Sequence, residues 1–280
     1  LLPREKRINF FNWCLHRKYT YSGGLNAKKI AYRSCAVAAS DIAACGGVLK
    51  WLAISFTTSS KDRKWIEDFS KGVREFSDSY KVPIIGGDLT SGKEISISIG
   101  VCGEIEKKYF MGRSGAREND HIFITGDLGE AFIGLNLLKN KKKKLSSKEK
   151  IYLKRFLKPD IEIAFSQDLS KFANSCIDIS DGLLGDLNHI CEESKLGAKI
   201  FLEDISFVGE YKNALTWGDD YQLCFTVPSN QQVEFEQWAD ANNFDVNAIG
   251  NMIPLDHNQD YLKIDNQTVS ITAGGYSHFK

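Results

Sequence analysis

The sequence predicts an α/β (α+β) protein with two domains, because helical and strand patterns alternate along the chain without an internal repeat. With 280 residues, of which 42% are apolar, the chain is long enough for one large core or two of ordinary size. A polar, glycine-containing stretch at 111–120 is typical of a domain junction. We therefore expect an atypical segment at 1–22, an N-terminal α/β domain at 23–110 and a C-terminal α/β domain at 111–280.

The N-terminal domain is expected to begin with a closely packed helix. Residues 25–47 are rich in Ala, Ser and Cys and end in glycine, which predicts a helix that lets its neighbours approach. Residues 65–80 carry apolar side chains at helical spacing and predict a second helix. The stretches 82–88 and 94–105 predict strands, and in the second strand one face is expected to carry Ile95, Ile97, Ile99 and Val101.

The C-terminal domain is expected to alternate strands with helices. After a strand, a glycine turn and a helix in 121–138, the predicted elements are a helix to about 174, a strand at 176–180, a helix at 181–195, a strand at 199–205, a turn at 216–220, a strand at 221–228, a helix at 230–243 and a final strand region.

Composition favours a small-molecule partner. Lys plus Arg and Asp plus Glu are both 36, so no overall field favours nucleic acid or an anionic membrane. The lysine-rich stretch 140–150 lacks interleaved aromatic residues and is expected to be a solvated loop. No apolar run approaches the roughly 18 residues needed to span a bilayer. Seven cysteines without a C-x-x-C pair indicate a reducing cytoplasm, with neither disulfides nor zinc.

The stretch CIDISDGLLGDL at 176–187 carries three aspartates and no lysine or arginine. Strand alternation sends Asp178 and Ser180 to one face, and Asp181 begins the next helix, so the three converge at a corner. Asp186 lies off the apolar face of that helix and is expected in solvent. A helix cap by Ser180 or Asp181 is an alternative, but it leaves Asp178 unexplained. Two close carboxylates without a basic neighbour favour a hard divalent cation, for which magnesium is the natural candidate.

Two other aspartates have similar surroundings. Asp41 interrupts a helix of very small residues, where a buried unpaired carboxylate would destabilise the fold by several kcal/mol. Gly86 and Gly87 let the backbone approach a ligand, and Asp88 follows them directly. A solvent-facing Asp41 and a simple turn at Asp88 are the alternatives. Three acidic sites at element ends together favour one multi-metal phosphate centre.

Six segments resemble the thiamine-monophosphate kinase family in order and spacing: AVAASDIAACGG, IIGGDLTSG, GRSGARENDHIFITGDLGEAFIGL, IDISDGLLGDL, ALTWGDDYQLCFTVP and GGYSHF. The resemblance covers roughly residues 23–280. The GGD and SDG motifs also suit the wider superfamily of aminoimidazole ribonucleotide synthetase, selenophosphate synthetase and the hydrogenase maturation dehydratase. The RSGA…GDLGEA and GDDYQL segments and the aromatic-x-His-Phe ending favour the thiamine enzyme.

The resemblance implies transfer of the ATP γ-phosphate to the phosphate of thiamine monophosphate by a magnesium-dependent homodimer. No residue is assigned as a catalytic acid or base. Asp219 stands where the family usually has glutamate, and its alternative role is a turn residue. The alternative for Arg113 is an ordinary surface residue, and the alternative for Tyr276 is a packed terminal aromatic residue. The implied magnesium ligands are Asp41, Asp88, Asp178 and Asp181, the implied ATP contacts are Gly87, Asp88, Arg113 and Ser180, and the implied thiamine contacts are Asp219 and Tyr276.

The N-terminal stretch departs from the family pattern. Family members carry there a G-D-D metal motif and an aspartate-threonine strand ending in His-Phe, whereas LLPREKRINFFNWCLHRKYTYSGG contains no aspartate, and the neighbours of His16 do not match. We therefore expect weak ATP binding and slow or absent turnover. The alternatives to an active kinase are a sister enzyme of the superfamily with another substrate and a non-catalytic ATP-binding protein.

Overall fold

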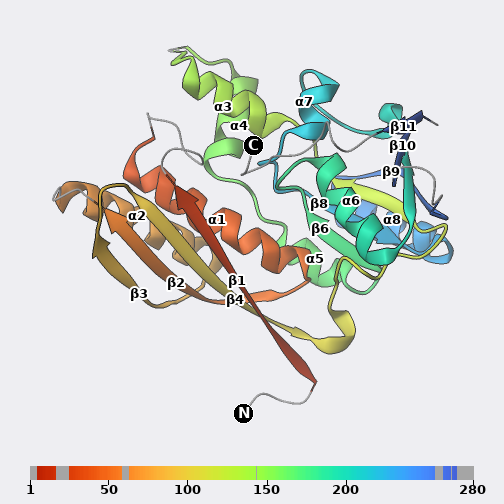
Figure 1. The fold of residues 1–280 in the computed structure, drawn as a ribbon, viewed down its shortest axis with the longest axis horizontal. Coiled ribbons are helices and arrows are strands. Elements are labelled where there is room, and N and C mark those ends of the chain that lie inside the picture. Colours follow the sequence, from red (N-terminus) through yellow and green to blue (C-terminus); the bar gives the residue numbers. More distant parts are fainter. Residues whose placement is uncertain are drawn as a thin grey trace.

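The computed structural model describes residues 5–16, 25–58, 63–142, 144–255, 261–265 and 267–269. Helices and strands alternate along the chain and build one four-stranded and one seven-stranded sheet (Figure 1), which confirms the predicted α/β (α+β) class with two domains.

The N-terminal sheet has the strand order β1-β4-β2-β3, with β2 and β3 parallel and the other pairs antiparallel. Helices α1 (Ala27–Ala44) and α2 (Arg63–Tyr80) cover one face of it (Figure 1). On β4 the predicted apolar face is confirmed, because Ile97, Ile99 and Val101 are fully buried and Ile95 packs against the same core. The strands are β1 (Lys6–His16), β2 (Val48–Thr58), β3 (Ile84–Ser91) and β4 (Ser96–Glu106).

Two strands of this sheet come from stretches that the sequence analysis did not assign. β1 falls in the segment 1–22 and pairs antiparallel with β4 over its whole length, from Lys6 opposite Glu106 to His16 opposite Ser96. β2 follows α1 directly and lies between β4 and β3. Both strands therefore help to close the core under α1 and α2.

The C-terminal sheet separates two apolar cores. Helix α6 (Leu183–Ser194) packs on one face, and α5 (Ile163–Leu169) and α8 (Gln232–Ala241) pack on the other. Neighbouring strand residues such as Ile122 and Phe123 point into opposite cores, as strand alternation requires. The sheet order is β11-β10-β7-β9-β5-β8-β6, from β5 (His121–Thr125), β6 (Ser175–Asp178), β7 (Gly197–Ile200), β8 (Leu223–Val227), β9 (Val246–Ile253), β10 (Leu262–Ile264) and β11 (Gln267–Val269).

The predicted helix up to residue 174 is two helices, α4 (Ser147–Leu157) and α5, because Pro159 interrupts it. α4 packs on α3 (Glu130–Lys139) beside the short helix α7 (Tyr211–Thr216). Short 3₁₀ helices occupy Lys107–Tyr109, Leu202–Asp204 and Ser229–Gln231.

Helix α1 joins the two domains. It contacts β2 and β4 of its own sheet and also β6, α4 and α5 of the C-terminal domain. Fifteen of its eighteen residues are buried, and its small side chains permit that close packing on several sides. In the part of the chain that the structure describes, no helix combines the length and apolar character needed to cross a membrane.

Candidate active site

A cavity of about 570 Å³ lies where β1, α1 and the segment after β4 meet the end of β6. Three of the predicted site residues, Asp41, Arg113 and Asp178, line this cavity together. The other lining residues are mostly apolar, with one further cation: Arg7, Ile8, Asn9, Phe11, Ala44, Cys45, Phe110, Met111, Gly112, Cys176 and Ile177. The fold thus brings together one acidic residue from each domain beside two arginines.

Asp178 ends β6 and is only 3% exposed. Burial raises the pKa of its carboxyl group well above the ordinary value, and the nearby Asp41 and Asp186 raise that pKa further. Its Oδ2 is buried and has no hydrogen-bond partner among the described residues. A buried carboxylate that faces a second carboxylate is destabilising unless a cation lies between them.

The donors in this cavity fit Mg²⁺. Oxygen ligands such as Asp41 and Asp178, one of them orphaned, are the type that this ion prefers, and Mg²⁺ is commonly held by one or two carboxylates together with substrate phosphates. Within the described ranges, no group of three or more His, Cys, Asp or Glu is arranged to hold a metal ion. The four-carboxylate centre with Asp88 and Asp181 stays a prediction.

Asp186 is not in solvent, contrary to the sequence prediction. It is 2% exposed, and its Oδ2 accepts hydrogen bonds from the backbone N–H groups of Ser180 (2.9 Å) and Asp181 (3.0 Å). Burial raises the pKa of Asp186 to about 7. These two hydrogen bonds hold the loop after β6 against the first turn of α6. The loop carries Ser180 and Asp181, which are predicted to contact the nucleotide and the metal.

Ser180 and Asp181 do not cap α6. The residue that precedes this helix is Gly182, and no side chain caps its first turn. The capping alternative for these two residues is therefore wrong. The apolar face predicted for α6 is confirmed, since the buried side chains include Leu183, Leu184, Leu187, Ile190 and Cys191.

Gly87 and Asp88 lie apart from the cavity. They belong to the exposed strand β3, opposite Ile54 and Ser55 of β2, and neither is among the described residues that line the cavity. A Cβ atom at Gly87 would lie 1.8 Å from the carbonyl oxygen of Ile54, so strand packing alone requires glycine there. The predicted ATP and metal roles of these two residues remain predictions.

Asp219 lies beside the Ser180 loop, while Tyr276 lies outside the described residues. The Asp219 N–H donates to the carbonyl of Ser180 (3.0 Å). A Cβ atom at Gly218 would lie 1.7 Å from the same carbonyl oxygen, so the two loops touch backbone to backbone. The predicted acceptor residue thus adjoins the predicted nucleotide residue.

Sequence reasoning missed two arginines at this junction. Arg7 on β1 lines the cavity and stacks on the ring of Phe110, with 3.7 Å between its Cζ and the ring centroid. Arg33 on α1 forms an ion pair with Asp219. Arg33 carries a usable signal, because a charged residue within a helix of small apolar residues needs a partner just as Asp41 does.

Comparison with known proteins identifies the family. Residues 11–105 match the model of the AIR synthase related protein N-terminal domain, and residues 117–263 match that of its C-terminal domain. The thiamine-monophosphate kinase of Escherichia coli (strain K12) is 35% identical over 261 residues, which cover 89% of this chain and 80% of that enzyme. The chain belongs to the thiamine-monophosphate kinase family.

Further thiamine-monophosphate kinases are similar to this chain. That of Buchnera aphidicola subsp. Schizaphis graminum is 42% identical over 214 residues, which cover 72% of this chain and 66% of that kinase, slightly less than two thirds. Among solved structures, AaThiL complexed with AMPPCP and TMP is 28% identical, with a TM-score of 0.88, and the match covers 100% of this chain and 89% of that chain.

Replacing Asp178 with asparagine should separate binding from folding. Asp178→Asn removes a buried ionisable group while it conserves shape, so we expect the metal-free protein to be as stable as the parent or more stable. Magnesium-dependent ATP binding should weaken roughly tenfold or more, because a charged oxygen ligand is lost. Calorimetric titration and urea unfolding measure the two effects. Asp240→Asn, an exposed change on α8, is the control, and equal effects of the two variants would contradict the site.

Substitutions at Asp186 should show how much its two hydrogen bonds to the loop after β6 stabilise the protein. Asp186→Ala leaves two backbone N–H groups without their acceptor, and we expect the free energy of unfolding to fall by about 2 kcal/mol or more. Asp186→Asn keeps an acceptor oxygen and should lose much less. Urea unfolding of both variants measures the difference, and a silent alanine variant would support the original prediction of a solvent-facing side chain.

Proposed function

We propose that this chain transfers the γ-phosphate of ATP to the phosphate of thiamine monophosphate, giving thiamine diphosphate and ADP. An oxygen of the acceptor phosphate forms the new bond to the γ-phosphorus, and the bond from that phosphorus to the ADP oxygen breaks. The observation that carries the proposal is the convergence of Asp41, Asp178 and Arg113 on one cavity in a chain of this family. The similar structure of AaThiL, complexed with AMPPCP and TMP, supports both substrates.

The residues around the cavity suit phosphoryl transfer, which needs positioning and charge neutralisation more than a covalent nucleophile. When bound, Mg²⁺ neutralises charge on the bridging phosphates. Asp41 and Asp178 would hold it, with Asp88 and Asp181 as further ligands. Arg113 would contact phosphate through its fork of donors, and Gly87, Asp88 and Ser180 would complete the nucleotide contacts.

On the acceptor side we assign Asp219 and Tyr276 to thiamine monophosphate. Asp219 is supported by its place against the Ser180 loop, which puts an acidic group next to the nucleotide contacts. Tyr276 rests on its match to the family pattern alone. Thiamine carries a ring amine beside its cationic ring, and a carboxylate oxygen can accept a hydrogen bond from that amine.

The alternatives are less well supported. A sister enzyme of the superfamily is disfavoured because relatives between 30% and 42% identical are thiamine-monophosphate kinases. The non-catalytic alternative, and with it the expected loss of turnover, rests on the absence of aspartate from residues 1–22. In the structure part of that segment forms β1. The expected loss of turnover is untested, and the kinase assay below decides between it and the turnover proposed here.

The proposed cellular location is the cytoplasm. Six cysteines in the described part of the chain are free thiols, and most of them are buried, as expected in a reducing compartment: Cys35, Cys45, Cys102, Cys176, Cys191 and Cys224.

The proposed assembly is a homodimer through the N-terminal sheet. Among the described residues, six of the ten exposed large apolar side chains belong to β1, β2 and β3, whereas the remaining four are scattered over the C-terminal domain. Such a concentration on one sheet, together with the exposed edge strand β3, favours contact with a second copy. The six are Ile8, Val48, Trp51, Ile84, Ile85 and Leu89.

A kinase assay on the purified chain tests the function. With ATP, Mg²⁺ and thiamine monophosphate, we expect thiamine diphosphate to form, and no product with aminoimidazole precursors or selenide. Asp219→Ala and Tyr276→Ala should raise the KM for thiamine monophosphate and leave ATP affinity nearly unchanged, because both residues are assigned to the acceptor. Loss of ATP binding in either variant would contradict these assignments, and absence of product from the parent chain would contradict the kinase function.

The dimer is testable with one pair of matched variants. Ile85 on β3 and Val233 on α8 are almost equally exposed, at 65% and 64%. Ile85→Lys places a charge in the proposed interface and should shift the protein toward the monomer, whereas Val233→Lys should not. Light scattering after size-exclusion chromatography measures the mass. A monomeric parent, or the same mass for both variants, would refute this interface.

A further inference from the structure

Arg33 is a buried cation that links the two domains. It is 3% exposed, and its Nη2 lies 2.5 Å from Oδ1 of Asp219. Its Nη1 donates to the carbonyl of Phe156, and its Cζ lies 4.2 Å from the centroid of the Phe156 ring. Within the described ranges, Asp219 is the one carboxylate at ion-pair distance from Arg33. Breaking such a buried pair by removing one partner is strongly destabilising, so this contact fixes the Asp219 loop against α1.

Both fixed contacts of the Asp219 side chain use the same oxygen. The hydroxyl of Tyr221 also donates to Oδ1, at 3.0 Å. Oδ2 has no hydrogen-bond partner in the described part of the chain, and the side chain is 26% exposed. Arg33 and Tyr221 therefore hold one side of the carboxylate and leave the other side open to a ligand.

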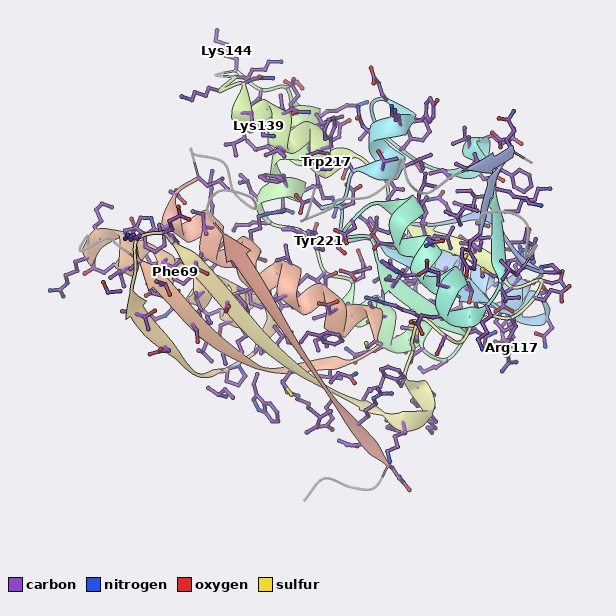
Figure 2. All side chains as sticks on the ribbon, viewed as in Figure 1. Phe69, Arg117, Lys139, Lys144, Trp217 and Tyr221 are labelled. Atoms are coloured by element: carbon purple, nitrogen blue, oxygen red, sulfur yellow. The ribbon has the colours of Figure 1, made fainter. Side chains whose placement is uncertain are left out.

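The backbone of this loop is held in an unfavourable conformation. Asp219 has φ +74° and Tyr221 has φ +54°, and both lie in the left-handed region that disfavours residues other than glycine by roughly 1 kcal/mol or more each. Hydrogen bonds from their N–H groups to the carbonyls of Ser180 and Ile179 maintain it. Tyr221 is itself buried and packs with the apolar cluster around α1. Figure 2 shows it between the two domains. Strain maintained in this way is typical of sites that position a group.

Helix α1 carries both ends of this arrangement. Arg33 and Asp41 are eight residues apart, which corresponds to roughly 12 Å along a helix axis. Asp41 lines the cavity assigned to the phosphates, and Arg33 fixes the carboxylate assigned to the acceptor. One rigid element therefore sets the separation between the two halves of the proposed reaction, which matters because misplacement by about 1 Å can lower a rate on the order of a hundredfold.

We propose that Arg33 is a positioning residue for the phosphoryl acceptor, which orients Asp219 so that its free oxygen faces the cationic, amine-bearing acceptor. The inference rests on the proposed function and deepens it. Arg33 also neutralises the charge of Asp219, so the ion pair has no net charge with which to attract a cationic acceptor. Its contribution is orientation, and this sets the sign of the expected effect. Loss of orientation raises the KM for the acceptor, whereas relief of cation repulsion alone would lower it.

The test is a double-mutant cycle. In Arg33→Met we expect the KM and the calorimetric Kd for thiamine monophosphate to rise roughly tenfold or more, while the Kd for ATP with Mg²⁺ changes less than about twofold. In an Asp219→Asn background, Arg33→Met should add less than about twofold, because it acts through Asp219. Arg33→Lys should recover part of the loss. Arg63→Met is the control, since Arg63 forms an exposed ion pair with Glu67 within α2.

Three results would overturn the proposal: a lowered acceptor KM in Arg33→Met, an undiminished effect in the Asp219→Asn background, or an equal loss of ATP affinity. If Arg33→Met fails to fold, Tyr221→Phe removes only the second hydrogen bond to Oδ1 and should raise the acceptor Kd about threefold or more; an unchanged Kd would count against the proposal. A parent chain that binds thiamine monophosphate without turnover would refute only the kinase function, and one that does not bind it would refute both.

Discussion

The burial of helix α1 on almost every side is the constraint on which the rest of the structure depends. Its Ala, Ser and Cys side chains let α2, the N-terminal sheet and three elements of the C-terminal domain approach its backbone. A charged group buried in such a helix needs a partner from a neighbouring element, and Arg33 pairs with Asp219. The partly exposed Asp41 lines the cavity instead, where it raises the pKa of Asp178. The interface between the domains is therefore also the site.

Regular elements were predictable where periodicity was undisturbed. The apolar faces of β4 and α6 follow from their spacing alone. β2 was missed because a bulge between Leu49 and Trp51 breaks its alternation, so its exposed residues Val48 and Trp51 are three positions apart instead of two. A pattern search for period two fails at such a bulge, although the strand pairs on both sides of it.

The site was predictable in part. Asp41 and Asp178 line one cavity, as the sequence indicated. Each is an isolated carboxylate in apolar surroundings, where it destabilises the fold unless it has a partner or a ligand, and this made both recognisable in the sequence. Asp186 was misjudged because helical spacing describes only the helix itself, and here the preceding loop turns back and covers the polar side. The partner of Arg33 lies 186 residues away in the sequence, a distance over which periodicity carries no information.

The site contains one carboxylate that is paired with a cation and one that is not. The paired carboxylate makes the site rigid, and the unpaired one makes it dependent on its ligands. On the acceptor side, Arg33 neutralises Asp219, so that pair contributes shape. On the phosphate side, burial raises the pKa of Asp178, and no basic side chain in the described residues lies within ion-pair distance of it. Carboxyl groups with perturbed pKa values gather at functional sites because the charge that destabilises the empty protein is the charge that binds the ligand. A cation and phosphates bound only by the folded state would offset that cost and stabilise the fold by mass action.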